Sequence, residues 1–151
     1  MTEPVREYRK QSRYAVDLNF DGGEGGDDEA LMRSVSTVNI ACGGHAGDEV
    51  SMRRVVRLAL AKGVAIQAHP SYEDRANFGR NPVALAPAGI EALVKEQVEA
   101  LRNIVRQEEG ELTGVKPHGA LYHAAATSPA VASAVARAVW SVSRDLVLVS
   151  S

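Results

Sequence analysis

The sequence predicts an α/β fold in which parallel strands alternate with helices. Short runs rich in branched apolar residues are separated by amphipathic stretches whose apolar residues recur at three- and four-residue spacing. This alternation favours a parallel sheet, because each helix returns the chain to start the next strand in the same direction. Two architectures remain open, a doubly wound open sheet and a barrel with its helices outside.

Composition points to one soluble globular domain. The 151 residues are 45% apolar, and the formal net charge of −2 argues against a nucleic-acid partner. The apolar runs are too short to cross a membrane, and residues 1–13 show no signal-peptide pattern. Because Cys42 is the single cysteine, no internal disulfide can form. We therefore expect a cytoplasmic protein with a free, buried thiol that binds neither membranes nor nucleic acid.

The fold is predicted to begin near Tyr14. Residues 1–13 have little to bury, so we expect a flexible N-terminal extension followed by a single domain over residues 14–151. The domain is predicted to start with a strand over residues 14–20. After a Gly/Asp loop come a short helix over residues 29–35 and a second strand over residues 37–42.

Asp48 is the predicted N-cap of a helix that Gly63 ends, and a third strand follows at residues 64–68. After a long loop, Pro87 begins the longest predicted helix, whose apolar stripe ends near Gly110. A fourth strand, a helix starting at Ser128 and Pro129, and a fifth strand complete the pattern, over residues 112–115, 128–140 and 146–149.

Polar clusters follow four of the predicted strands. They comprise residues 17–21 with Glu24, then residues 45–48, 69–71 and 116–119. In both parallel architectures, ligands bind at the carboxyl ends of the strands. We therefore expect His45, His69 and His118 to lie at one edge of the sheet, whereas His123 falls in a helical stretch outside the site.

Neutral imidazoles together with a carboxylate are typical ligands of a divalent metal. Asp17, His45 and His118 are the candidate metal ligands, and the sequence does not identify the metal. The candidates are scattered singly along the chain, so their spacing alone does not define a coordination set. The same side chains could equally hydrogen-bond a polar substrate.

Four further residues are candidates for substrate binding or catalysis. Lys116, beside His118, is suited to polarise a carbonyl or hold a carboxylate. Asp48 could orient a histidine or simply cap its helix. Arg75 and Arg80 could clamp a carboxylate or form ordinary surface ion pairs. The glycine-rich loop at residues 22–26 has neither the Gly-Lys-Ser/Thr nor the Gly-x-Gly-x-x-Gly pattern of nucleotide-binding loops. We therefore expect it to form a tight turn.

Four ordered motifs resemble the LamB/YcsF family. They are Asp17-Leu-Asn, then NIACGGHAGD at residues 39–48, AHPSYEDRANFGR at residues 68–80 and VKPHGALY at residues 115–122. The resemblance runs from about Tyr14 to the last residue. It implies a distorted (β/α) barrel related to the polysaccharide-deacetylase-like superfamily.

The resemblance also implies an activity. Bacterial members serve as the A component of an ATP-dependent 5-oxoprolinase, which opens the lactam of 5-oxoproline to glutamate together with subunits B and C. Opening a lactam needs an activated carbonyl, a water and a base. The implied catalytic residues are Asp17, His45, His69, Lys116 and His118. Substrate contacts are expected at Asn19, Glu24, Asp48, Arg75 and Arg80.

The chain departs from the family pattern at four positions without losing an acidic or histidine side chain. Phe20, Gly22, Gly44 and Gln67 stand where the family tends to have alanine, leucine, an aromatic residue and glycine. The bulk added at Phe20 and removed at Gly44 could shift substrate preference.

Length adds a further expectation. Barrels of this kind commonly need roughly 250 residues, so the chain is expected to form about three-fifths of a barrel. The exposed strand edge would favour a homodimer or larger oligomer. Two alternatives to the 5-oxoprolinase function stay open. One is a metal-dependent amide hydrolase or deacetylase that works without ATP, and the other is a non-catalytic binding or assembly subunit.

Overall fold

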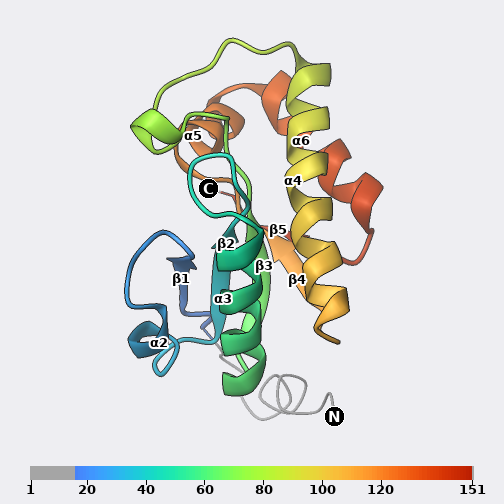
Figure 1. The fold of residues 1–151 in the computed structure, drawn as a ribbon. Helices are drawn as coiled ribbons and strands as arrows, with labels where there is room; N and C mark the ends of the chain where they lie inside the picture. Colours follow the sequence, from blue (N-terminus) through green and yellow to red (C-terminus); the bar gives the residue numbers. More distant parts are fainter. Residues whose placement is uncertain (1–15, 151) are drawn as a thin grey trace.

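A computed structural model describes residues 16–150 of the chain, so the predicted extension at residues 1–13 lies outside the described part. Five parallel strands form one sheet in the order β1-β2-β3-β4-β5 (Figure 1). They are β1 Asn19–Gly22, β2 Thr37–Ala41, β3 Ala65–His69, β4 Leu112–Val115 and β5 Val147–Leu148. Each strand pairs with its neighbours in the chain, as in a barrel, and the order shows no reversal of the kind a doubly wound sheet has. The predicted partial (β/α) barrel is confirmed.

Helices connect the strands. They are α2 Asp28–Leu31, α3 Glu49–Lys62, α4 Pro87–Gln107, α5 Gly119–Thr127 and α6 Pro129–Val142, with a 3₁₀ turn η1 at Arg75–Asn77. Helices α3 and α4 pack against the sheet, and α6 packs against α4 (Figure 1). No helix within residues 16–150 is long and apolar enough to cross a membrane.

The two faces of the sheet differ in chemistry, because alternate residues of a strand point to opposite sides. Val38, Ile40 and Ile66 belong to the apolar core beneath the helices. Asn39 and Gln67 are paired in register and buried on the other face, which we call the polar face. The amide oxygens of these two residues have no hydrogen-bond partner among the described residues. The polar face ends at the carboxyl edge of the sheet.

The bounds of two strands differ from the sequence prediction, and one aromatic residue of a predicted helix is exposed. The first strand begins at Asn19, later than predicted, and just before it the Leu18 carbonyl accepts from the Ser36 amide at the turn into β2. Trp140 lies on α6 but is 59% exposed, and its ring stacks under the Arg144 guanidinium. The fifth strand is limited to Val147–Leu148.

Cys42 is free and buried, as predicted. Burial raises the pKa of its thiol to about 12. The thiol is therefore protonated at neutral pH, and it donates to the Ile40 carbonyl over 3.0 Å. A protonated, buried thiol is a packing group and not a nucleophile.

Candidate functional site

Four side chains converge at the carboxyl edge of the sheet. Glu24 follows β1, His45 follows β2, His69 ends β3 and His118 follows β4, so four successive strands each deliver one side chain. One nitrogen or oxygen atom from each lies within 4.8 Å of the corresponding atom of the others. The expectation that the three histidines meet at one edge is met. We call this group the histidine–glutamate cluster.

The spacing inside the cluster suits a single metal ion. His45 Nε2 lies 2.7 Å from Glu24 Oε1, and His118 Nδ1 lies 3.0 Å from His69 Nε2. Glu24 Oε1 is 3.8 Å from both His69 Nε2 and His118 Nδ1. Ligand atoms around a tetrahedral zinc ion are roughly 3.3–3.6 Å apart. The cluster could therefore hold a metal.

Two of the rings have their protons fixed on the outer side. His69 Nδ1 lies 2.6 Å from the Lys116 carbonyl oxygen, and His118 Nε2 lies 2.8 Å from the Phe78 carbonyl oxygen. A carbonyl oxygen only accepts, so these outer nitrogens carry the protons and donate. In the neutral rings, His69 Nε2 and His118 Nδ1 therefore face each other with their lone pairs. The two lone pairs repel each other, and a proton or a cation between them relieves the repulsion.

His45 follows the same pattern through a hydroxyl group. Its Nδ1 lies 2.9 Å from Ser71 Oγ, and Ser71 Oγ donates to the Tyr72 carbonyl over 2.9 Å. Since that hydroxyl proton is already used, His45 Nδ1 donates and Nε2 carries the lone pair. The lone pair points at the Glu24 carboxylate. Bonds of this kind to the outer ring nitrogen are typical of metal-binding histidines.

The cluster is shielded from water. The side chains of His45, His69, His118 and Glu24 are 0%, 1%, 11% and 18% exposed. Burial lowers the pKa of His118, and the neighbouring His45 and His69 lower it further, against the raising effects of the Phe78 carbonyl and Glu24. Because its pKa lies below the ordinary value, His118 is neutral at physiological pH and can act as a ligand.

An ion pair lies directly beside the cluster. Lys116 Nζ is 2.9 Å from Asp21 Oδ1, which also accepts from Asn39 Nδ2 over 2.9 Å. Asp21 Oδ2 lies 3.4 Å from His69 Nε2. Burial raises the pKa of Asp21, but its interactions with His69 in the protonated form of that ring, with the hydrogen bonds from Lys116 and Asn39, together bring it well below the usual range. Asp21 is therefore ionised at neutral pH.

The loop between β3 and α4 closes one side of the cluster. The Phe78 ring meets the His45 and His118 rings edge-on, with ring centres 5.1 and 5.4 Å apart. The next residue, Gly79, has a φ of 66°, and a Cβ there would lie 2.9 Å from His45 Cβ and 3.0 Å from His118 Cδ2. Any side chain at position 79 would force the loop or the two histidines to shift.

Residues 16–151 match the LamB/YcsF family. The chain belongs to the LamB/YcsF family. It is 52% identical over 141 residues to the A component of 5-oxoprolinase from Chloroflexus aggregans and 51% identical over 140 residues to that from Chloroflexus aurantiacus. Each alignment covers 89% of this chain but only 56% and 55% of those proteins, so the chain spans a little over half their length.

The fold has a close counterpart among solved structures. The crystal structure of a lactam utilization protein from Thermus thermophilus matches with a TM-score of 0.90 and 41% sequence identity. The match covers 91% of this chain and 58% of that chain. Both the predicted family and the predicted fold class are confirmed.

Asp17 is not brought to the cluster of this LamB/YcsF protein. It precedes β1, at the end of the strand opposite to the cluster, where its Oδ1 accepts from the hydroxyls of Ser36 and Thr37. Asp17 thus joins the starts of β1 and β2. The geometry does not support the predicted catalytic and metal-binding roles of Asp17, and Glu24 supplies the carboxylate of the cluster.

Asn19 and Asp21 both lie on β1 and point to the polar face of the sheet. Asn19 Oδ1 accepts from Asn39 Nδ2 over 2.8 Å, one step below Asp21. Asp21 is the site residue that is missing from the sequence-based candidates. The strand alternation signals it, since Asp21 shares a face with Asn19 once β1 is known to start there.

The two arginines predicted to contact the substrate, Arg75 and Arg80, have different partners. Arg75 Nη1 donates to the carbonyls of Gly43 and Gly47 over 2.9 and 2.8 Å, so it holds the loop after β2. Arg80 is exposed, and its guanidinium carbon lies 5.4 Å from the centre of the Phe78 ring. Because Phe78 contacts the cluster, Arg80 is the arginine that is better placed to reach a ligand there.

Asp48 is the N-cap of α3. Its side chain accepts from the Ser51 amide over 2.8 Å, while Ser51 Oγ accepts from the Asp48 amide over 2.8 Å. The helix ends at Gly63 in the left-handed conformation. Both predicted ends of this helix are confirmed, and the side chain of Asp48 is used for capping.

Replacement of Asp48 with alanine is therefore expected to lower the free energy of unfolding by about 1 kcal/mol, since it removes the capping interaction. Chemical denaturation of the variant measures this loss. The Zn²⁺ affinity proposed below for the cluster should stay within twofold of wild type. A large loss of affinity with little loss of stability would instead indicate a direct role in the site.

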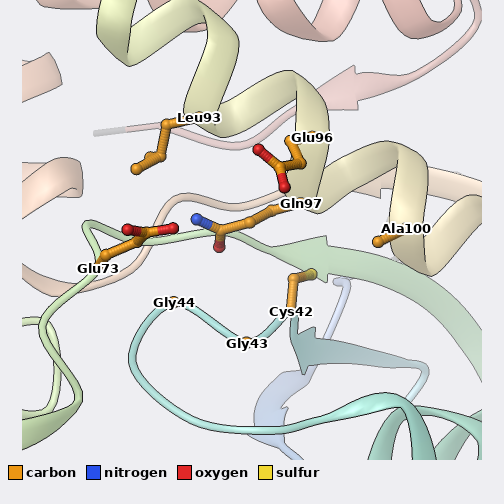
Figure 2. A pocket seen from close by; sticks show the side chains of 8 residues that line it. All are labelled: Cys42, Gly43, Gly44, Glu73, Leu93, Glu96, Gln97 and Ala100. Atoms are coloured by element: carbon orange, nitrogen blue, oxygen red, sulfur yellow. The ribbon is translucent and has the colours of Figure 1, made fainter.

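A small cavity lies between α4 and the loops that follow β2 and β3 (Figure 2). It has a volume of about 220 Å³ and is lined by Cys42, Gly43, Gly44, Glu73, Leu93, Glu96, Gln97 and Ala100. Gln97 reaches from α4 toward the loops, where it accepts from the Ser71 amide over 3.1 Å and donates to the Ser71 carbonyl over 2.7 Å. A Cβ at Gly44 would lie 2.6 Å from Ser71 Oγ. Ser71 and Gln97 thus fill the space that a side chain at position 44 would need.

Proposed function

We propose that this chain takes part in the hydrolytic opening of the lactam of 5-oxo-L-proline to L-glutamate, as the A component of an ATP-dependent 5-oxoprolinase with subunits B and C. The observation that carries the proposal is the histidine–glutamate cluster beside the Lys116–Asp21 ion pair. The names of the two Chloroflexus relatives support it. A buried set of this composition suits hydrolysis of an unactivated amide.

We further propose that Glu24, His45, His69 and His118 hold one divalent metal ion. Three imidazole nitrogens with one carboxylate suit Zn²⁺ better than Mg²⁺ or Ca²⁺, which prefer oxygen ligands. The outward hydrogen bonds of the three rings leave the inward lone pairs free for a cation. When bound, such an ion supplies a Lewis acid for the lactam carbonyl and a lowered pKa for water.

The residues beside the cluster have separate roles in this proposal. The Lys116 ammonium lies where it can stabilise negative charge that develops on the lactam oxygen. Asp21 stays ionised, and its Oδ2 faces His69, so it can orient the attacking water as a hydrogen-bond acceptor. The phenyl ring of Phe78 excludes water from one side.

ATP is proposed to be used by the assembled complex. The glycine-rich loop at residues 22–26 carries Glu24 into the histidine–glutamate cluster, so this loop has a role other than binding phosphate. We therefore expect the handling of ATP to involve subunits B and C.

The test is glutamate formation from 5-oxoproline by this chain reconstituted with subunits B and C. We expect turnover that requires ATP and all three components. If the folded, assembled complex forms no glutamate, the activity is contradicted and a binding or assembly role is favoured. The metal-compatible cluster also favours a second candidate, an amide hydrolase or deacetylase without ATP, and turnover in the absence of ATP would select it.

Arg80→Gln is expected to raise the KM for 5-oxoproline by about 10- to 100-fold with little change in kcat, because a charge-assisted bond to the substrate carboxylate is worth about 1.5–3 kcal/mol. Steady-state kinetics of the complex measures both constants. Arg80→Lys keeps the charge and should recover part of the loss. The exposed Arg33, which pairs with Glu29 on α2, provides a control as Arg33→Gln. An unchanged KM in Arg80→Gln would contradict the carboxylate contact.

A further inference from the structure

One buried carboxylate has no part in the proposed reaction. Asp28, the first residue of α2, is 3% exposed. Its Oδ2 lies 2.5 Å from Arg54 Nη2 on α3, and its Oδ1 accepts from the Gly23 amide over 3.0 Å. A buried carboxylate is costly unless it is paired and hydrogen-bonded. Both oxygens of Asp28 are satisfied, one by a charge and one by the backbone amide next to Glu24.

The loop that Asp28 holds would otherwise be weakly constrained. Gly23 and Gly25 have φ values of 75° and 92°, conformations that glycine adopts without strain. A Cβ at Gly25 or Gly26 would have no atom within 4 Å, so this part of the loop is not packed on one side. Glycines also increase the number of conformations available to a free loop. A specific anchor is therefore needed to keep Glu24 facing the histidines.

We propose that Asp28 and Arg54 form a clamp that positions Glu24 in the histidine–glutamate cluster. The clamp acts through the Gly23 amide, and it rests on the metal centre of the proposed function. Arg54 sits on α3, which also packs on β2, so the clamp ties the loop after β1 to the rigid body of the sheet. Asp28 and Arg54 are positioning residues, because neither belongs to the cluster.

A neighbouring ion pair provides a matched control. Arg57 lies on the same helix as Arg54, and their side chains are 65% and 56% exposed. Arg57 pairs with Glu108, which follows α4. Arg54→Gln and Arg57→Gln each remove one ion pair from α3, but only the first is connected to Glu24.

The first experiment measures Zn²⁺ affinity of the full chain by titration. Arg54→Gln is expected to bind Zn²⁺ about tenfold more weakly, a typical effect of losing a group that orients a ligand, whereas Arg57→Gln should stay within twofold of wild type. Arg54→Lys keeps the charge and should restore most of the affinity. In a Glu24→Gln background, Arg54→Gln should have no further effect, since the group it positions no longer coordinates.

The second experiment measures amide hydrogen exchange of residues 22–27, a readout that does not depend on metal. Arg54→Gln should speed exchange in this segment by about tenfold while Arg57→Gln leaves it unchanged. Exchange at residues 37–41 of β2 shows whether the fold is intact. Unchanged exchange in residues 22–27, or equal affinity losses in the two arginine variants, would overturn the clamp. If the wild-type chain takes up no Zn²⁺, the metal centre fails and the exchange comparison alone decides the clamp.

Discussion

His118→Ala is expected to lower turnover of the reconstituted complex by about a thousandfold or more, because it removes one of the inward nitrogens of the cluster. Loss of a group that merely orients a metal ligand costs 10- to 100-fold in affinity or activity. Loss of a ligand itself should exceed that. Zn²⁺ affinity of the chain should fall by at least about a hundredfold, and steady-state kinetics and metal titration measure the two effects.

His123 provides the control for His118. It is exposed on α5, whose N-cap is His118, and it lies outside the cluster. His123→Ala should therefore leave turnover and Zn²⁺ affinity close to wild type. Thermal unfolding of both variants checks that the fold is intact. Near-normal turnover in a folded His118→Ala variant would rule out the role given to this histidine.

Gly79→Ala is expected to lower the free energy of unfolding by about 2–5 kcal/mol. The left-handed backbone at position 79 costs an alanine about 1–2 kcal/mol. The added methyl group would overlap with His45 and His118, and overpacking of this kind costs about 1–3 kcal/mol more. Because the two rings must move, Zn²⁺ affinity should fall as well. Chemical denaturation and metal titration measure the two effects.

Gly63 separates the two contributions. Its φ of 68° is close to the 66° of Gly79, but a Cβ at Gly63 would have no atom within 4 Å. Gly63→Ala should therefore show only the backbone cost, about 1–2 kcal/mol, with Zn²⁺ affinity unchanged. Equal losses of stability in the two variants, with the metal affinity of both intact, would contradict the close packing of the loop on the cluster.

Local signals in the sequence are enough to predict most of the fold. The fourth strand matches residues 112–115 as predicted, and the helix from Asp48 to Gly63 has both of its predicted ends. The choice between barrel and open sheet depends on which strands pair, and that is not a local property of the chain. The family resemblance implies the barrel, and the pairing of consecutive strands confirms it.

Part of the site can also be predicted from local signals in the sequence. His45, His69 and His118 follow strands, so their meeting at one edge follows from the parallel sheet. The choice of carboxylate depends on where β1 starts, since this places Asp17 at one end and Glu24 at the other. The ring protons are set by backbone carbonyls of Phe78 and Lys116, which no residue pattern reveals.

Binding of one divalent metal ion by the histidine–glutamate cluster underlies the proposed function and the clamp alike. It is tested most directly by titrating the metal-free full chain with Zn²⁺ and measuring the stoichiometry, with His69→Ala alongside. We expect one tightly bound ion per wild-type chain and loss of that ion in His69→Ala. No tight binding by the wild-type chain, or the same stoichiometry and affinity in His69→Ala, would contradict the metal centre.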